Sequence, residues 1–233
     1  MEFTAPLIQG RLIRRYKRFL ADVELESGET VTAHCPNPGS MLGLAEPGFG
    51  VWLSESANPK RKHKHSWELV AADGTLVGIN TGHPNGLVGD AVAEGRIAEL
   101  AGYGSLRREV RYGENSRIDL LLEDAAKPPC YVEVKNVHLM RRPGVAEFPD
   151  SVTARGRKHL LELANMVESG ARAVMVYLVQ RGDCTQVEIA ADIDPAYAEA
   201  LNAVLARGVE AICYDCRVSS TAIDVEKRLP LVI

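Results

Sequence analysis

Long hydrophobic runs are missing from this sequence. The chain has 233 residues and 46% of them are hydrophobic, yet no run approaches the roughly eighteen apolar residues that a membrane-spanning helix needs. The amino-terminal stretch turns basic at Arg11–Arg18, where a secretory signal would turn apolar. The sequence therefore predicts a cytoplasmic protein with no membrane partner.

Cysteine is scarce, and its placement argues against a disulfide framework. The five cysteines are odd in number and scattered along the chain, which is typical of reduced thiols. Cys213 and Cys216 form a single CxxC pair, but no second CxxC or histidine pair supplies the two further ligands of a structural zinc site. The surrounding segment alternates like a strand, so we interpret the pair as core or surface thiols.

Excess positive charge is also missing, because the net charge is −4. The basic residues are instead bunched, in one cluster around Tyr16 and in a second run at residues 60–65. Charged side chains that follow phosphates, next to rings that stack on bases, are typical of proteins that bind single-stranded nucleic acid. The first cluster gives the candidate nucleic-acid-binding residues Arg14, Arg15, Tyr16, Lys17 and Arg18.

Short apolar runs separated by turn residues fill residues 1–84. Alternation is clear after residue 18, where Phe19, Ala21, Val23 and Leu25 share one face of a predicted strand. Several short strands without a helix indicate a small antiparallel barrel or sandwich. A five-stranded OB-like β-barrel fits the size of this region. The turn-rich segment Asn80–Leu87 is the expected junction with a second domain.

Residues 85–233 have a mixed pattern of helices and strands. Helices are predicted at 88–101, 153–169 and 195–207, because apolar residues recur there at helical spacing. Strands are predicted at 106–112, 117–123, 130–137, 172–180, 186–190 and 209–217. The strand at 172–180 is apolar almost throughout, as expected for a strand covered on both faces. The order α-β-β-β-α-β, followed by a further α-β, predicts a mixed α/β sheet flanked by helices.

The hairpin predicted at residues 117–137 carries the most informative polar residues. If residue 119 pairs opposite residue 133, Asp119 and Glu133 stand side by side, and Lys135 follows on the same face. Opposed Cβ atoms in such a ladder lie about 5 Å apart. Two carboxylates about 4 Å apart repel by roughly 4 kcal/mol at an effective dielectric near 20. A divalent cation between them relieves this repulsion, and ligands that are all oxygen favour Mg²⁺ or Mn²⁺.

Such an ion would polarise a phosphoryl oxygen and generate hydroxide from its bound water. Lys135 would then position the attacking water or neutralise developing charge. An ordinary solvated hairpin, in which Lys135 simply pairs with the two acids, is the alternative interpretation. The position of the hairpin within the α-β-β-β-α-β order favours the metal site.

With Asp119, Glu133 and Lys135 on a hairpin within this order of elements, the sequence resembles the PD-(D/E)xK nuclease-like fold. Over essentially its whole length it also resembles the sugar fermentation stimulation protein (SfsA) family. The motifs that carry this second resemblance are RRYKRF (14–19), HCPNPGSM (34–41), NTG (80–82), ELAGYGSLRREVRYG (99–113), SRIDLLL (116–122), CYVEVKNV (130–137), FPDSVTARGRKHLLEL (148–163) and GVEAICY (208–214).

The resemblance implies an OB-like domain at 1–84, a PD-(D/E)xK-like domain at 85–233 and DNA binding without strict sequence specificity. It also implies catalytic residues Asp119, Glu133 and Lys135, with the backbone carbonyl of Val134 as a further metal ligand. The nuclease fold usually adds an acidic residue from its first helix, and we favour Glu99 over Asp90 for this role. Ile118 stands where the proline of the motif name is expected.

Basic residues also occur at the predicted start of the helix that follows the hairpin. A helix amino terminus with basic side chains is a ready phosphate site, and the family pattern includes Arg155 and Lys158. A solvated polar face of that helix is the simpler alternative. We add Arg155 and Lys158 to the candidate nucleic-acid-binding residues.

Three functional hypotheses follow from these residues. In the first, the domain hydrolyses DNA with Asp119, Glu133, Lys135 and Mg²⁺ or Mn²⁺. In the second, the nuclease fold is only a DNA-binding platform, and the protein is a non-catalytic regulator, as the family name suggests for sugar metabolism. In the third, RNA is the ligand. Homodimers are common among nucleases of this class, but no interface can be identified from the sequence.

Overall fold

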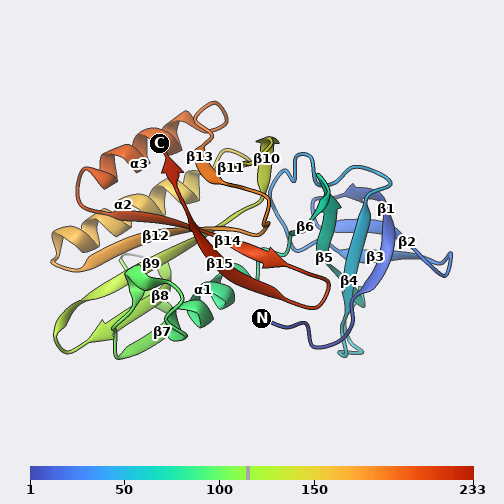
Figure 1. The fold of residues 1–233 in the computed structure, drawn as a ribbon, viewed down its shortest axis with the longest axis horizontal. Coiled ribbons are helices and arrows are strands. Elements are labelled where there is room, and N and C mark those ends of the chain that lie inside the picture. Colours follow the sequence, from blue (N-terminus) through green and yellow to red (C-terminus); the bar gives the residue numbers. More distant parts are fainter. Residues whose placement is uncertain (114–115) are drawn as a thin grey trace.

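A computed structural model describes residues 1–113 and 116–233. Figure 1 shows a β-barrel on one side and a larger α/β domain on the other, joined at the end of β6. The amino-terminal segment runs back to the larger domain, where the Met1 amine donates to the carbonyl oxygen of Ile223 at 2.9 Å. Among the described residues, no helix combines the length and the apolar character needed to span a bilayer.

The amino-terminal domain is a closed five-stranded barrel with one added strand. Neighbouring strands pair in the order β3-β2-β1-β4-β5-β6, and a parallel contact between His34 and Ser66 joins β3 to β5 and closes the barrel. This connectivity confirms the expected OB-like barrel. Its strands are β1 (Ile8–Tyr16), β2 (Leu20–Leu25), β3 (Thr30–His34), β4 (Gly50–Glu55), β5 (His65–Ala72) and β6 (Thr75–Gly78).

The core of the barrel follows from strand alternation. Ala21 and Val23 of β2 are fully buried, and Val31 and Ala33 of β3 lie opposite them in the antiparallel register. Phe19, expected on the same face, instead precedes the strand and is 44% exposed. A register shift at Leu12 lets β1 bend around the barrel.

The second domain is built on a six-stranded sheet in the order β15-β14-β12-β9-β8-β7. The helices and main-sheet strands follow one another in the predicted order, α1, β7, β8, β9, α2 and β12, with β10 and β11 inserted between β9 and α2. Its elements are α1 (Pro84–Ala93), the 3-10 turn η1 (Ala98–Leu100), β7 (Ser105–Tyr112), β8 (Ser116–Asp124), β9 (Lys127–Val137), α2 (Ala154–Glu168), β12 (Arg172–Val179), α3 (Pro195–Leu205), β14 (Glu210–Val218) and β15 (Ile223–Leu229).

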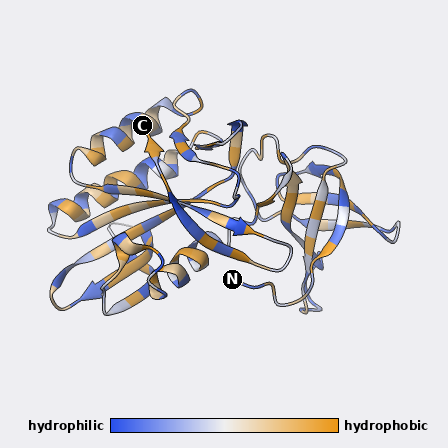
Figure 2. Ribbon diagram, in the orientation of Figure 1, coloured by the Kyte–Doolittle hydropathy of each residue, from blue (hydrophilic) through white to orange (hydrophobic). Residues whose placement is uncertain are grey.

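Helices cover both faces of this sheet (Figure 1). On β12, Val174 and Val176 pack with α1, whereas Met175 and Tyr177 pack with α2 and α3. The prediction that this strand is covered on both faces is therefore confirmed. Figure 2 shows the central strands as largely hydrophobic and α2 as mixed in hydropathy, which is consistent with a helix that has one buried face.

Three parts of this domain differ from the sequence prediction, and one of them is β15, which was not predicted. The helix predicted at 88–101 has the wrong bounds, because α1 already ends at Ala93 and Gly95 takes a left-handed φ of 74°. Pro84, at the start of α1, explains its earlier beginning. A small second sheet, unpredicted apart from its strand near residue 186, contains β10 (Leu139–Arg142), β11 (Val145–Phe148), β13 (Gln186–Ile189) and β16 (Leu231–Val232) in that order.

The two domains are held together by specific contacts. The Gly78 amide donates to the Gln180 carbonyl oxygen at 2.8 Å. Arg181, which is only 1% exposed, binds Asp73 of the barrel at 2.9 Å. Ser40 of the barrel donates to the backbone carbonyl of Asp150 at 2.8 Å. These contacts cross the boundary at several points and fix the cleft between the domains.

Candidate active site

The two central carboxylates lie on adjacent strands. The antiparallel register of β8 and β9 pairs Leu120 with Val132 and Leu121 with Tyr131. Continued by one step, this register places Asp119 opposite Glu133, as the sequence predicted. Val132 and Val134 face the core beneath α1, so Glu133 and Lys135 point to the face covered by α2.

Asp119 is held by one backbone amide and one side-chain amide. Its Oδ2 accepts a hydrogen bond from the Val134 N–H at 2.7 Å, and its Oδ1 accepts one from Asn85 Nδ2 at 2.7 Å. Asn85 lies in the first turn of α1 and also donates to Glu109 at 3.1 Å. The residue of α1 that reaches Asp119 is therefore Asn85, whose side chain is an amide and not the expected carboxylate.

Glu133 is almost completely buried, with 2% of its surface exposed. Its Oε1 accepts from Lys135 Nζ at 2.7 Å and also hydrogen-bonds His159 Nδ1 of α2. Its Oε2 is buried and has no hydrogen-bond partner among the described residues. A buried polar atom without a partner is costly, so this oxygen is a candidate position for a ligand.

The two carboxyl groups have opposite pKa shifts. Burial, reinforced by the charge of Glu133, raises the pKa of Asp119 to about 6. Burial alone would also raise the pKa of Glu133, but the His159 hydrogen bond and the Lys135 charge together hold it below its usual range. The site therefore concentrates negative charge that Lys135 and His159 only partly offset, a condition that favours a bound cation.

A pocket of about 540 Å³ opens beside these residues, and we call it the α2 pocket. Asp119 and His159 line it together with the predicted phosphate-binding residues Arg155 and Lys158, which are both exposed. Arg155 Nε donates to His159 Nε2 at 3.3 Å. The helix start that carries these cations is capped by the Thr153 hydroxyl, which accepts from the Gly156 N–H at 3.0 Å.

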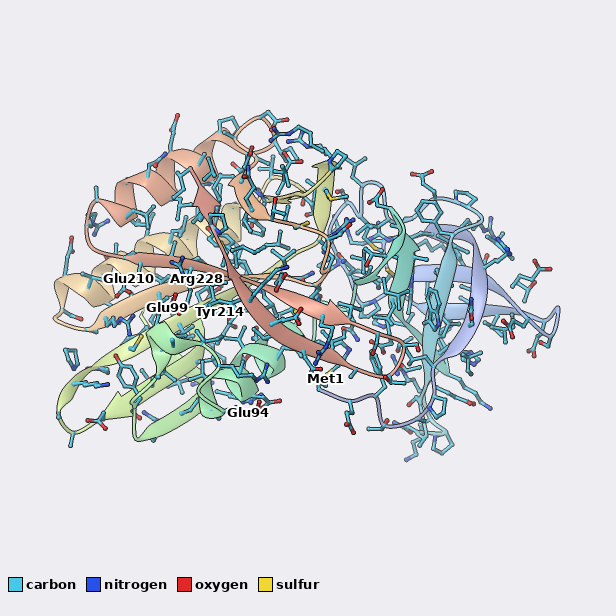
Figure 3. All side chains as sticks on the ribbon, in the orientation of Figure 1. Met1, Glu94, Glu99, Glu210, Tyr214 and Arg228 are labelled. Atoms are coloured by element: carbon cyan, nitrogen blue, oxygen red, sulfur yellow. The ribbon has the colours of Figure 1, made fainter. Side chains whose placement is uncertain are left out.

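The structure corrects the prediction for the helix carboxylate. Glu99 is not at the site, because its carboxylate accepts from Tyr214 at 2.6 Å and pairs with Arg228. Figure 3 shows these three side chains grouped together, and none of them lines the α2 pocket. Asp90, the alternative, forms an ion pair with Arg108 at 2.7 Å. Glu99 lies beyond the end of α1, in the 3-10 turn η1, whereas Asp90 lies within α1 but pairs with Arg108 rather than lining the α2 pocket.

Part of the predicted basic cluster in the barrel is used to hold the barrel itself. Arg15 donates to the carbonyl oxygens of Asn37 and Gly39, each at 2.9 Å. Arg14 pairs with Asp22 at 2.9 Å, and the Tyr16 hydroxyl donates to the same carboxylate at 3.0 Å. These contacts favour structural roles for Arg14, Arg15 and Tyr16.

Lys17 and Arg18 remain exposed in the turn between β1 and β2, where both take positive φ angles. The adjacent Phe19 ring stacks on His34 with centroids 6.5 Å apart. The second basic run, at residues 60–65, lies in the loop between β4 and β5. In OB folds the loops that correspond to these two bind oligonucleotides.

The CxxC pair does not form a site. Cys213 packs in the core beneath α2 and α3, whereas Cys216 packs in the core beneath α1. The two thiols lie on opposite faces of β14, so they cannot bind one ion. Burial raises the pKa of Cys213 to about 12, which is expected for an unreactive core thiol.

Two residues that shape the site could not be assigned to it from the sequence. His159 stands in the sequence among the polar residues at the start of α2, yet only 6% of its surface is exposed and it contacts Glu133. Its spacing from Leu160 and Leu163 on the same helix already indicated an inward direction. Asn85 lay within a segment interpreted as a turn, and no sequence signal marked it.

The residues present fit a hard divalent cation with few protein ligands. No group of three or more His, Cys, Asp or Glu side chains suited to a metal occurs within residues 1–113 and 116–233. Mg²⁺ keeps several waters and is usually held by one or two carboxylates together with substrate phosphates. Asp119 and the unpartnered Oε2 of Glu133 match that requirement.

Comparison with protein families identifies the chain. Residues 13–79 match the SfsA N-terminal OB domain, and residues 82–222 match the sugar fermentation stimulation protein RE domain. The chain belongs to the sugar fermentation stimulation protein family. The match to both domains, in order, confirms the resemblance drawn from the sequence motifs.

Individual relatives agree along the whole chain. A sugar fermentation stimulation protein homolog of Paramagnetospirillum magneticum is 62% identical over 225 residues, which cover 97% of this chain and 95% of the relative. A homolog of Maricaulis maris is 60% identical and covers 97% of each chain. Among solved structures, Pyrococcus furiosus SfsA in complex with Ca²⁺ has a TM-score of 0.89 and 26% identity, covering 100% of this chain and 98% of that chain.

Proposed function

We propose that this protein binds DNA across both domains and cleaves it at a divalent-metal site formed by Asp119 and Glu133. The observation that carries the proposal is the buried Glu133 carboxylate, which leaves Oε2 without a partner beside Asp119. The strand and helix order around these residues is that of the PD-(D/E)xK nuclease-like fold, to which we assign the domain. The solved relative bound to Ca²⁺ supports divalent-cation binding in this family.

The chain's own residues have separate tasks in this proposal. Asp119 and Glu133 would hold Mg²⁺ or Mn²⁺, and such an ion lowers the pKa of a water molecule and polarises a phosphoryl oxygen. Lys135 neutralises charge next to Glu133, and His159 fixes the Glu133 side chain through a hydrogen bond to the same oxygen, Oε1. Arg155 and Lys158 line the pocket and would bind the phosphates that flank the scissile bond.

The DNA path would begin on the barrel. Lys17, Arg18 and Phe19 project from the β1–β2 turn, and the basic run at 60–65 lies in the β4–β5 loop. Arg18 lines the cleft between the domains, as does Arg155, which also lines the α2 pocket. A strand bound by the barrel would pass from Arg18 through the cleft to Arg155, which lies beside Asp119 in the α2 pocket. Contacts of this kind, made mainly to phosphates, recognise DNA without strict sequence specificity.

One observation favours the second hypothesis, a DNA-binding regulator of sugar use without catalysis. Both oxygens of Asp119 already accept hydrogen bonds from Asn85 and Val134, and Lys135 and His159 both contact Glu133. The carboxylates are thus partly satisfied by the protein itself. RNA is the ligand in the third hypothesis, and a direct comparison of substrates distinguishes it.

The test compares the parent protein with Glu133→Gln on single-stranded DNA, double-stranded DNA and RNA, with Mg²⁺, Mn²⁺ or EDTA. Glu123→Gln is a matched control, because Glu123 is an exposed acid in β8 that pairs with Arg107. Metal-dependent DNA cleavage that is lost only in Glu133→Gln supports the proposal. DNA binding without cleavage by the parent protein would favour the regulator, and preferential RNA cleavage would replace the DNA assignment.

A further inference from the structure

The cleft between the two domains has the features of a small binding site. Its volume is about 520 Å³, within the range of pockets that enclose small ligands. Arg18 of the barrel lies on one side and Arg155, at the start of α2, on the other. The walls include Pro38 and Phe148, which are flat or apolar surfaces against which a ring can pack.

His138 provides a hydrogen-bond donor in this cleft. Gln180 Nε2 donates to the Asn80 carbonyl oxygen and to Asn136 Oδ1, so Asn136 must turn its Nδ2 toward the histidine ring. That amide donates to His138 Nδ1 at 2.9 Å, which leaves the ring proton on Nε2. His138 Nε2 is buried and has no hydrogen-bond partner among the described residues, and the side chain is only 6% exposed.

Asp150 provides an acceptor next to this donor. Its Oδ2 lies 3.6 Å from His138 Nε2, too far for a hydrogen bond between them, so both groups can serve a third partner. The barrel approaches Asp150 so closely that a Cβ at Gly39 would lie 2.3 Å from its Oδ2. Ser40 and the Met41 amide also lie near the carboxylate and hold it in place.

A donor next to an acceptor matches the edge of a nucleobase, which presents both kinds of group side by side. Proteins read an extruded base by hydrogen bonds to this edge and by packing of aromatic or apolar side chains against its faces. Two arginines at the mouth of the cleft match the phosphate of the same nucleotide. The cleft and the α2 pocket share Arg155, so such a nucleotide would lie next to the carboxylates.

We propose that this cleft holds one unpaired nucleotide of the bound DNA strand, with its base edge at His138 and Asp150 and its phosphate between Arg18 and Arg155. The inference rests on the proposed DNA binding and adds to it a site for a single base. It assigns the contact between the domains a binding role, because each domain supplies part of the site.

The experiment measures binding of deoxycytidine 5′-monophosphate and of deoxyribose 5-phosphate to the full-length protein by calorimetry in EDTA. The parent protein is expected to bind the nucleotide at least ten times more tightly than the sugar phosphate, which lacks the base edge. Asp150→Asn should remove most of that preference. Arg18→Ala should weaken both ligands about equally, whereas Arg11→Ala, at an exposed arginine of β1 outside the cleft, should change neither.

Equal binding of the two ligands by the parent protein would overturn the inference, as would unchanged binding in both Asp150→Asn and Arg18→Ala. Arg18 is exposed, so the second variant keeps the test decisive if Asp150→Asn fails to fold. Binding of a single-stranded oligonucleotide, measured in parallel, separates the two proposals. Oligonucleotide binding without nucleotide binding would contradict only the proposed nucleotide site in the cleft. Nucleotide binding without DNA cleavage would contradict only the proposed nuclease activity.

Discussion

Two buried glutamates in this protein show how an ion pair differs from a candidate metal ligand. Glu147 of β11 is 5% exposed, and both of its oxygens accept from the Arg141 guanidinium, at 2.7 and 2.9 Å. Glu133 of β9 is 2% exposed, but its partners converge on one oxygen and leave the other without any. The first arrangement is complete within the protein, and the second leaves one carboxylate oxygen with unused hydrogen-bonding capacity.

The surroundings of the two residues differ in the same way. Arg141 has a second carboxylate partner in Asp192, so charges near Glu147 are matched by an ion-pair network. Glu133 instead faces Asp119, and their mutual repulsion contributes to the raised pKa of Asp119. A site that is poorly satisfied without a ligand is expected to trade stability for function. Matched substitutions at Asp119, Glu133 and Glu147 test this difference.

The largest expected effect is on DNA cleavage. Asp119→Asn and Glu133→Gln should each reduce metal-dependent cleavage by at least about 100-fold, the scale on which one preorganised electrostatic contact acts. Glu147→Gln should leave the cleavage rate within about two-fold of the parent once folding is confirmed, because its partners lie outside the α2 pocket. Rates are measured with a labelled oligonucleotide at saturating Mn²⁺. Equal losses in all three variants would contradict the distinction.

The second effect is on stability, and the two sites should respond with opposite signs. The folded-state pKa of Asp119 is about 6, above its ordinary value of 3.8. A raised carboxyl pKa means that the metal-free protein loses stability as the pH rises through this interval, because the unfolded chain gives up its proton first. The cost above pH 6 is at most about 3 kcal/mol, from a pKa difference of about 2.

Asp119→Asn removes that cost but leaves one of the two amide donors without an acceptor, so in EDTA it should gain stability relative to the parent as the pH rises from 4 to 7.5. Glu147→Gln should instead lose about 1 to 2 kcal/mol at pH 7.5, since Arg141 is partly exposed and keeps Asp192. Urea unfolding at both pH values measures the free energies. Destabilisation of both variants by the same amount at pH 7.5 would show that Asp119 is an ordinary structural acid.

The smallest expected effect distinguishes two arginines through the salt dependence of DNA binding. Arg155 lines the α2 pocket and hydrogen-bonds only His159 among the described residues, whereas Arg141 is held by two carboxylates. Arg155→Ala should lower the slope of log affinity against log salt by about 0.7 to 0.9, the loss of one phosphate contact. Arg141→Ala should leave the slope unchanged. Equal slopes for Arg155→Ala and the parent protein would show that Arg155 makes no phosphate contact with the DNA.

Much of the architecture could be predicted because the relevant signals are local. Alternation in β8 and β9 gave the hairpin and the placement of Asp119 opposite Glu133, and the apolar run in β12 gave its burial on both faces. The helix carboxylate could not be predicted, because it depends on where α1 ends. Gly95 ends the helical stretch early, so Glu99 faces Tyr214 and Arg228 instead.

Contacts between segments that are distant in the sequence could not be predicted either. The basic residues 14–18 looked uniform, but Asp22 pairs with Arg14 and backbone carbonyls of the loop at 37–40 bind Arg15, whereas Lys17 and Arg18 stay exposed. His159 looked like a polar helix residue until α2 packed over Glu133. Charge and type are visible in a sequence, whereas the partner of each charge is decided by tertiary packing.

The central claim is that Glu133 and Asp119 bind a divalent cation, and calorimetric titration with Mn²⁺ tests it directly without requiring catalysis. The parent protein and Glu147→Gln should bind one ion per chain with the same affinity, and Glu133→Gln should bind at least about ten times more weakly, the scale of an altered metal site. Equal Mn²⁺ affinity in the parent protein and Glu133→Gln, or no binding to the parent protein at all, would contradict the account.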